Sequence, residues 1–329
     1  MSSAQLKAIP VAHPSFQDRD FQDRDFRNQD LQPYHARLPT TDFGTFWYGG
    51  RLSALEHACA ASFVFRGYAL TLFSYQPVEN VPDGVTVANA ADVLPEEMTR
   101  RFLHNGRPAL GHFSDLFRYV MIRQYGMAWV DLDVLMLSNR IAYTLPDIVA
   151  REEQGGINGA ILYLRDAAML QSLIAGAEAM ADRNLRWGET GPLLLGKLAK
   201  AYPETLRPAA ANIFYPIEHY DIQKVLLPEW RDACAAKCGQ AITLHLFNNI
   251  LTGMGYWKDM APPEGSFLYE ALAADGALGL FRDIYPVTVM RNMVRNYQFG
   301  LNGAALGIRS IVRQAFPSVL RTYRHYYPR

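Results

Sequence analysis

The sequence predicts an α/β protein whose mostly parallel sheet is covered by helices. From about residue 41, short apolar stretches alternate with segments of helical periodicity, which is the pattern that parallel sheets produce. The chain has 329 residues, half of them hydrophobic, enough for one large domain or two small ones. Its 32 basic and 32 acidic side chains give no net charge, and we therefore expect no nucleic-acid partner.

The first expected elements lie between residues 45 and 95. TFWYGG (45–50) resembles a short aromatic strand, and residues 51–67 have helical periodicity with Gly67 at their end. YALTLFSY (68–75) follows as a second strand. A loop rich in Pro, Gly and Asn leads to VTVANAADVLP (85–95), which predicts a further strand and a turn.

The middle of the chain predicts a helix and a strand. HFSDLFRYVMIRQYG (112–126) is apolar at helical spacing, with Ser114 as the expected N-cap, Asp115 in the first turn and Gly126 as the left-handed stop. AWVDLDVLML (128–137) follows and is predicted to form one continuous strand.

Later elements complete the alternation. INGAILYL (157–164) predicts a strand, and an alanine-rich helix follows from about 166 to 182. WGETGPLLLGKLAKAY (187–202) predicts a turn and a helix, with Pro192 suited to the first helical position. ITLHLFNN (242–249) predicts a late strand.

Three regions follow from these patterns. Residues 1–40 are polar and contain the imperfect repeat FQDRD-FQDRD-FRNQD, which predicts a flexible arm. Residues 41–280 are expected to form the main domain. Residues 281–329 are predicted to be a basic helical extension, with seven arginines and no acidic residue from Arg291 onward. That extension is either a solvated basic face or a peripheral contact with anionic lipid.

No signal peptide or membrane-spanning segment is visible, and the three cysteines cannot form a disulfide framework. We therefore expect a cytoplasmic protein, located at the inner face of the membrane if the basic extension binds lipid.

Two aspartates, Asp131 and Asp133, interrupt the apolar stretch GMAWVDLDVLML. Burying unpaired carboxylates is costly, so a partner is expected. In an extended backbone the two side chains point to the same side, where their oxygens suit Mg²⁺ or Mn²⁺. Capping of helices or pairing with arginines is the alternative interpretation.

Asp115 and Arg118, three residues apart on the preceding helix, share one of its faces. A guanidinium can bind phosphate oxygens with two hydrogen bonds, and a carboxylate can accept from sugar hydroxyls. The pair alone is equally explained as an intrahelical ion pair.

The block SDLFRYVMIRQYGMAWVDLDV resembles the signature of the DXD-containing sugar transferases. That family includes α-1,4-galactosyltransferases, initiating α-1,6-mannosyltransferases and capsule or lipopolysaccharide enzymes. Its usual form is S-D-x-x-R-Y-x-x-L-x-x-x-G-G-x-Y-x-D-x-D, from which this chain departs at Ile122, Met127 and Trp129. The W-x-G opening, the T-G-P turn and LHLFNN are similar to further family segments, in the family's order, across residues 41–272.

The resemblance implies a GT-A fold with a divalent metal, Mn²⁺ or Mg²⁺, at its centre. It implies that Asp133 ligates the metal directly and that Asp131 contacts it through water or contacts the ribose. His245 would be the third ligand, although a lone histidine in ITLHLF is otherwise more often a core residue.

The resemblance also implies the nucleotide contacts. Trp47, Tyr48 and Gly50 would surround the base and ribose, and Asp115 and Arg118 would hold the donor sugar and its diphosphate.

The expected function is a metal-dependent, retaining glycosyltransferase that moves a hexose from a UDP-sugar to a hydroxyl of a glycan or glycolipid. Asn158 and Glu189 are candidates on the acceptor side, with a backbone turn and helix-dipole complementarity as the alternatives. Trp257 is a candidate for closing over the donor, or a buried aromatic. A non-catalytic sugar-nucleotide binding module and a metal-dependent phosphodiesterase are the other candidate functions.

Overall fold

The computed structural model describes residues 38–139 and 143–301. The predicted N-terminal arm with its repeat, up to residue 37, and the basic stretch 302–329 lie outside the described residues, so those two predictions stay open.

A six-stranded sheet organises these residues, in the order β3-β2-β1-β6-β9-β8. Its strands are β1 (Asp42–Phe46), β2 (Ala69–Ser74), β3 (Thr86–Asn89), β6 (Ala128–Val130), β8 (Ile148–Arg151) and β9 (Ile157–Tyr163). The first four in spatial order run parallel, whereas β9 is antiparallel to both of its neighbours. The predicted α/β class with a mostly parallel sheet is confirmed, and the arrangement is consistent with a GT-A-like fold.

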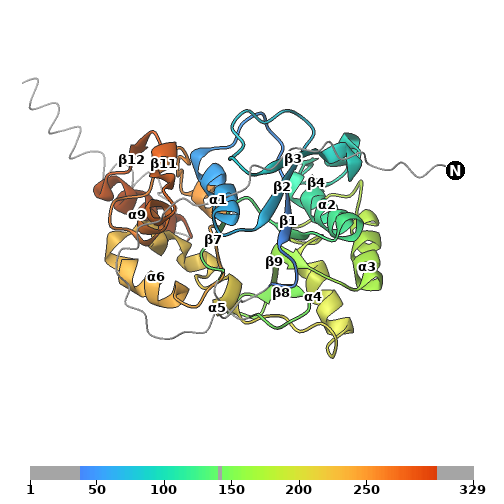
Figure 1. The fold of residues 1–329 in the computed structure, drawn as a ribbon. Coiled ribbons are helices and arrows are strands. Elements are labelled where there is room, and N and C mark those ends of the chain that lie inside the picture. The colour runs from blue at the N-terminus through green and yellow to red at the C-terminus, as the bar shows by residue number, and fades with distance from the viewer. Residues whose placement is uncertain (1–37, 140–142, 302–329) are drawn as a thin grey trace, which may run out of the picture. The chain divides into compact units, whose positions relative to one another are not determined.

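Helices cover both faces of this sheet (Figure 1). The helix α1 (Ala54–Phe65) lies on one side, and α2 (Leu110–Tyr125), α3 (Ala167–Glu178) and α4 (Pro192–Ala201) lie on the other. Each face has its own apolar cluster, one around Phe63 and Leu72 and one around Phe117 and Leu162. The burial of both faces explains why the strand sequences are almost continuously apolar.

Local signals fix several of the helix ends, and those at Gly67, Gly126 and Pro192 were predicted. Ser53 and Glu56 form a capping box at the start of α1. Gly67 follows α1 with φ +81°, and Gly126 ends α2 in the left-handed conformation. Pro192 occupies the first turn of α4.

The predicted N-cap of α2 is wrong. The helix begins at Leu110 with Ala109 as its N-cap, so Ser114 lies inside it and its hydroxyl accepts a hydrogen bond from Arg118 (3.3 Å). The chain enters the helix from a short hairpin ending at Pro108, which sets the helix start without any side-chain cap. Asp115 is therefore in the second turn rather than the first.

The predicted continuous strand 128–137 is also wrong, because it is broken at the aspartates. β6 ends at Val130. A turn follows, in which the Val134 amide donates to the Asp131 carbonyl (3.1 Å). After the turn, β7 (Val134–Met136) leaves the main sheet. There it pairs antiparallel with β10 (Thr243–His245), the late strand that the sequence predicted. The first strand likewise ends early, at Phe46, which leaves Trp47–Gly50 in a loop.

A second group of helices packs beside α1 around its own apolar cluster, which includes Leu226, Leu268, Met290 and Val294. Its elements are the 3₁₀ helices η3 (His219–Leu226), η4 (Pro228–Trp230) and η5 (Ala277–Leu280), with α6 (Arg231–Cys238), α7 (Asn248–Gly253), α8 (Phe267–Ala274) and α9 (Val287–Leu301). The remaining elements are η1 (Ala90–Asp92), η2 (Glu96–Arg100), β4 (Leu103–His104), β5 (Arg107–Pro108), α5 (Ala211–Phe214), β11 (Met260–Ala261) and β12 (Asp283–Ile284). Among the described residues, no helix is both long enough and apolar enough to span a bilayer. The predicted domain boundary near residue 280 stays a prediction.

Candidate functional site

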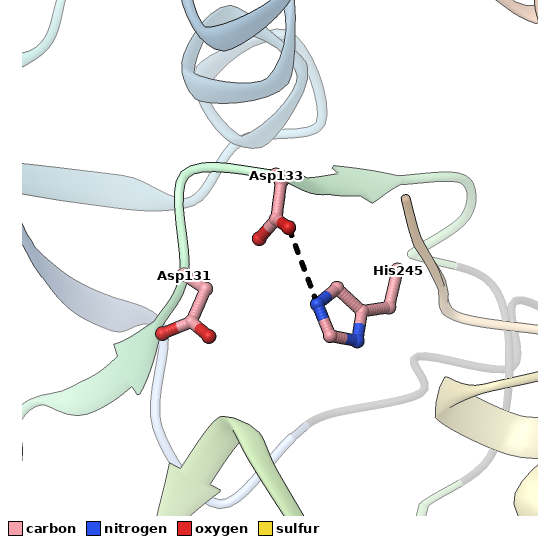
Figure 2. Close-up of side chains that lie close together, drawn as sticks. All are labelled: Asp131, Asp133 and His245. Atoms are coloured by element: carbon pink, nitrogen blue, oxygen red, sulfur yellow. Dashed lines mark ion pairs between the residues drawn. The ribbon is translucent and has the colours of Figure 1, made fainter. Parts of the chain in front are cut away.

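Two aspartates and a histidine face one another where β6, β7 and β10 meet. Ligand atoms of Asp131, Asp133 and His245 all lie within 4.8 Å of one another. Figure 2 shows the three side chains directed at a common space, with Nε2 of His245 3.4 Å from Oδ2 of Asp133. The sequence predicted this trio, and the structure brings its members together through a turn rather than through a pleated strand.

Strand register positions the histidine. His245 pairs with Val134 across β7 and β10, and the Leu246 amide donates to the Asp133 carbonyl (2.8 Å). Phe247 then adopts a left-handed conformation (φ +50°), which turns the chain. The next amide, that of Asn248, therefore donates to Oδ2 of Asp133 at 2.6 Å.

Charge and burial act in opposite directions on this trio. Burial raises the pKa of Asp131. The positive charge of Arg118 offsets only part of this rise, and the like charge of Asp133 adds to it. Burial also acts to raise the pKa of Asp133, but His245 and the Asn248 amide outweigh it, so the pKa of Asp133 is lowered. The pKa of His245 is raised, because its pairing with Asp133 outweighs its burial.

These residues fit a divalent cation. Two carboxylates and an imidazole are a donor set typical of Mn²⁺ and related ions. The two half-buried carboxylates repel each other, and a cation between them would relieve that repulsion. Nδ1 of His245 is also buried without a hydrogen-bond partner in the described part of the chain. The group is therefore a candidate metal site.

Arg118 links this group to α2. Its Nη2 lies 3.2 Å from Oδ1 of Asp115 and 3.3 Å from Oδ1 of Asp131, and its Nη1 donates to the Gly159 carbonyl (2.7 Å). Arg118 and Asp115 are 6% and 7% exposed, so the intrahelical ion pair that the sequence also allowed is present and is buried. One buried guanidinium thus holds a carboxylate from the helix and another from the β6–β7 turn.

Residues from the T-G-P turn hold Asp115 in place. The Thr190 hydroxyl donates to Oδ2 of Asp115 (2.7 Å) and lies 2.8 Å from Nδ1 of His112. The Tyr119 hydroxyl donates to the Thr190 carbonyl (2.9 Å). Sequence reasoning assigned no role to Thr190 or His112, and the T-G-P turn was the signal that pointed to Thr190.

Trp129 is another contributor whose role the sequence did not indicate. Its indole Nε1 donates to Oδ1 of Asp131 (2.6 Å), and its ring lies beneath the Arg118 guanidinium, 5.0 Å from centroid to Cζ. Trp129 occupies the position where the resembled family has tyrosine. Its N–H orients the Asp131 carboxylate, which the sequence difference by itself did not indicate.

A cavity of about 770 Å³ contains this group, and it is called the donor cavity after the role proposed for it below. Its volume falls within the usual range for ligand sites. Eight of the predicted site residues line it: Trp47, Tyr48, Asp115, Arg118, Asp131, Asp133, Asn158 and His245. Their convergence joins residues from five separate segments of the chain.

Three predicted residues lie elsewhere. Gly50 does not line the donor cavity; its carbonyl accepts from the Glu79 amide (2.9 Å). Glu189 lines a second cavity and pairs with Arg186 (3.2 Å). Trp257 is half exposed, outside the donor cavity, with Arg282 over its ring.

The structure adds a second acidic group that the sequence did not indicate. Ligand atoms of Glu152, Glu218 and His219 lie within 4.8 Å of one another, and Glu152 and His219 line the donor cavity. The Asn158 amide donates to Glu152 (2.7 Å), and Oε2 of Glu218 is buried without a partner among the described residues. Burial raises the pKa of Glu218.

No protein-family model matches the chain, and no curated protein matches it. Among solved structures, the chain is similar to one titled "PaToxG Glycosyltransferase", with a TM-score of 0.34 and 11% identity over 78% of this chain and 85% of that one. Similarity at this level adds nothing to the fold assignment, which depends on the sheet order and register described above.

Proposed function

We propose that the protein is a metal-dependent, retaining glycosyltransferase that moves a hexose from a nucleotide sugar, most simply UDP-hexose, to a hydroxyl of a glycan or glycolipid. The observation that carries the proposal is the donor cavity itself. In it, a carboxylate–carboxylate–imidazole group lies beside a buried arginine. The two carboxylates and the arginine come from the block that resembles the DXD-containing sugar transferases, and the imidazole comes from the later segment LHLFNN.

In this proposal Asp131, Asp133 and His245 hold Mn²⁺ or Mg²⁺. A bound divalent cation supplies positive charge that stabilises a departing diphosphate. The Asn248 amide and the Trp129 indole keep the two carboxylates oriented for this purpose, since each donates to one of them.

Arg118 and Asp115 act on the donor. Arg118 lines the donor cavity and is held in place by two carboxylates. Its guanidinium is therefore already oriented when a diphosphate enters and needs no reorganisation. Asp115 accepts hydrogen bonds from hydroxyl groups of the donor sugar. Trp47 and Tyr48 line the part of the cavity assigned to the base and ribose, and Gly50 remains a prediction for the same contact.

Transfer breaks the bond between the anomeric carbon and the diphosphate oxygen and forms a bond from that carbon to the acceptor oxygen. The acceptor proton passes to the departing phosphate, so no dedicated base is required. Asn158 is assigned to the acceptor side of the cavity, and Glu189 and Trp257 remain predictions for acceptor contact and closure. The proposed location is the cytoplasm, at the inner face of the membrane if the basic extension binds lipid.

The test is UDP release from a panel of UDP-sugars with Mn²⁺. We expect one donor to be turned over, and Asp133→Ala to lower the rate at least about 100-fold. Asp232→Ala, which removes an exposed aspartate on α6, is the matched control and should stay within about twofold of wild type. Absence of both metal-dependent UDP release and metal-dependent UDP binding would refute the proposal. UDP binding without turnover would instead indicate a binding module.

The Glu152–Glu218–His219 group favours one alternative, a two-ion phosphodiesterase, because it places more carboxylates and a second histidine at the same cavity. The products distinguish the two activities. A transferase releases UDP, whereas a phosphodiesterase cleaves the diphosphate and releases UMP and a sugar phosphate.

A further inference from the structure

A second cavity of about 960 Å³, here called the basic cavity, lies on the α4 side of the sheet. Six charged side chains line it: Arg151, Arg183, Arg186, Lys197, Lys200 and Glu189. Five cations against one carboxylate give a formal charge of +4 in a chain whose net charge is zero. Such a concentration of one charge in a concave site focuses the potential and attracts anions.

Most of these cations lack an internal counter-charge. Arg186 pairs with Glu189 at 3.2 Å. The other four, Arg151, Arg183, Lys197 and Lys200, form no ion pair within residues 38–139 and 143–301. Holding uncompensated like charges together costs free energy, which an anionic ligand would recover.

The basic cavity adjoins the donor cavity along three segments of the chain. Arg151 and Glu152 are consecutive and line the basic and the donor cavity, respectively. Ile157 lines the basic cavity, and the next residue, Asn158, lines the donor cavity.

The turn before α4 is the third segment. Trp187 and Gly188 line the donor cavity, Arg186 and Glu189 line the basic cavity, and Pro192 lines both. A ligand in the basic cavity therefore lies next to the side of the donor cavity where Asn158 is found. Trp187 is 64% exposed at this boundary, so its ring is open to a sugar face.

We propose that the basic cavity binds the acceptor and that the acceptor is an anionic glycan, one whose sugars carry phosphate or carboxylate groups. This inference rests on the proposed function, because it assigns the substrate class of the same reaction. The guanidinium groups of Arg151 and Arg183 suit two-point binding of phosphate or carboxylate, and Lys197 and Lys200 add point charges from α4.

The experiment measures binding of two charged probes, tetragalacturonate and a 6-phosphorylated mannopentaose, and of neutral mannopentaose, by calorimetric titration in about 0.15 M salt. At that salt concentration, charges more than roughly 8 Å apart are largely screened, so binding reports close contacts. We expect at least one charged probe to bind about tenfold or more tightly than the neutral one. The better charged probe identifies phosphate or carboxylate as the recognised group.

The variant Lys197→Glu/Lys200→Glu changes the formal charge of the cavity from +4 to zero and should weaken binding of the charged probe at least about tenfold. Lys197→Ala/Lys200→Ala, which leaves +2, should give an intermediate loss and guards against misfolding of the first variant. Lys237→Glu, on exposed α6 outside both cavities, is the matched control and should bind as wild type does.

Equal affinity for charged and neutral probes, no binding of either charged probe, or unchanged binding in both lysine variants would overturn the inference. So would equally tight binding of a single-stranded DNA 12-mer, because it would show attraction to any polyanion. The wild-type UDP-release assay is read separately: release of UDP without preference for charged probes retains the proposed function and rejects only this inference.

Discussion

Replacing Gly191 with alanine should displace Asp115. A Cβ built at Gly191 would lie 2.7 Å from both carboxylate oxygens of Asp115 and 2.9 Å from its Cγ, distances that real Cβ atoms essentially never show. Asp115 has a short side chain held by Thr190 (2.7 Å) and Arg118 (3.2 Å), so it cannot swing aside without loosening both contacts. The carboxylate must therefore shift by roughly 0.5 Å or more to reach an ordinary contact distance.

The magnitude follows from this overlap. Overpacking a buried site costs about 1–3 kcal/mol, which corresponds to a fall of about 2–10 °C in the unfolding midpoint of a domain of this size. If Asp115 holds the donor sugar, a misplacement approaching 1 Å should lower UDP release by about 100-fold. Mn²⁺ affinity should change less, because Asp115 is not a metal ligand and reaches the metal group only through the Arg118 contact to Asp131. Differential scanning fluorimetry, UDP release and Mn²⁺ titration measure the three quantities.

Gly196→Ala is the matched control. Gly196 lies within α4, and a Cβ there would meet nothing within 4 Å. Alanine in a helix interior should raise stability by about 0.5–1 kcal/mol. If Gly191→Ala instead keeps the wild-type unfolding midpoint and UDP release, then Asp115 is not confined against the Gly191 backbone and the described donor contacts are wrong.

Three further predictions concern His245, the Arg66–Asp275 ion pair and the indole of Trp129. The raised pKa of His245 means that its proton competes with a cation, so Mn²⁺ affinity should fall by up to about tenfold per pH unit as the pH drops below that raised pKa. A pH-independent affinity measured by electron paramagnetic resonance would contradict this. In the metal-free protein the same raised pKa gives a stabilisation that is fully present below the unfolded pKa and is lost as pH rises through the folded pKa. Arg66→Ala removes both hydrogen bonds to the buried side chain of Asp275 (2.8 Å each). The free energy of unfolding, measured by urea denaturation, should fall by about 3–5 kcal/mol. A double variant that replaces both Arg66 and Asp275 with alanine should lose less stability, because it leaves no unpaired charge. Trp129→Phe deletes the N–H donated to Asp131 and should cost about 1–2 kcal/mol and weaken Mn²⁺ binding; unaltered binding would mean that the indole does not orient this carboxylate.

The sequence by itself determined the local features of this chain. The start of α1 at Ser53, its end near Gly67, the stop of α2 at Gly126 and the start of α4 at Pro192 all depend on hydrogen bonds or dihedral angles within about four residues. The alternation of apolar strand and helix segments likewise predicted the sheet and its helical layers. The candidate metal residues were predictable because the block around Asp131 resembles a known family.

Only the tertiary structure decided how the site is assembled. His245 meets Asp133 because β10 pairs with β7 in one register, and the Asn248 amide reaches across 115 residues to the same carboxylate. Thr190 meets Asp115 across 75 residues, and Arg151 joins a cavity with residues of α4. A sequence pattern specifies which face of an element is apolar, but many registers and strand orders would bury that face equally well. The break after Val130 and the charge gathered in the basic cavity therefore became visible only once the elements were packed together.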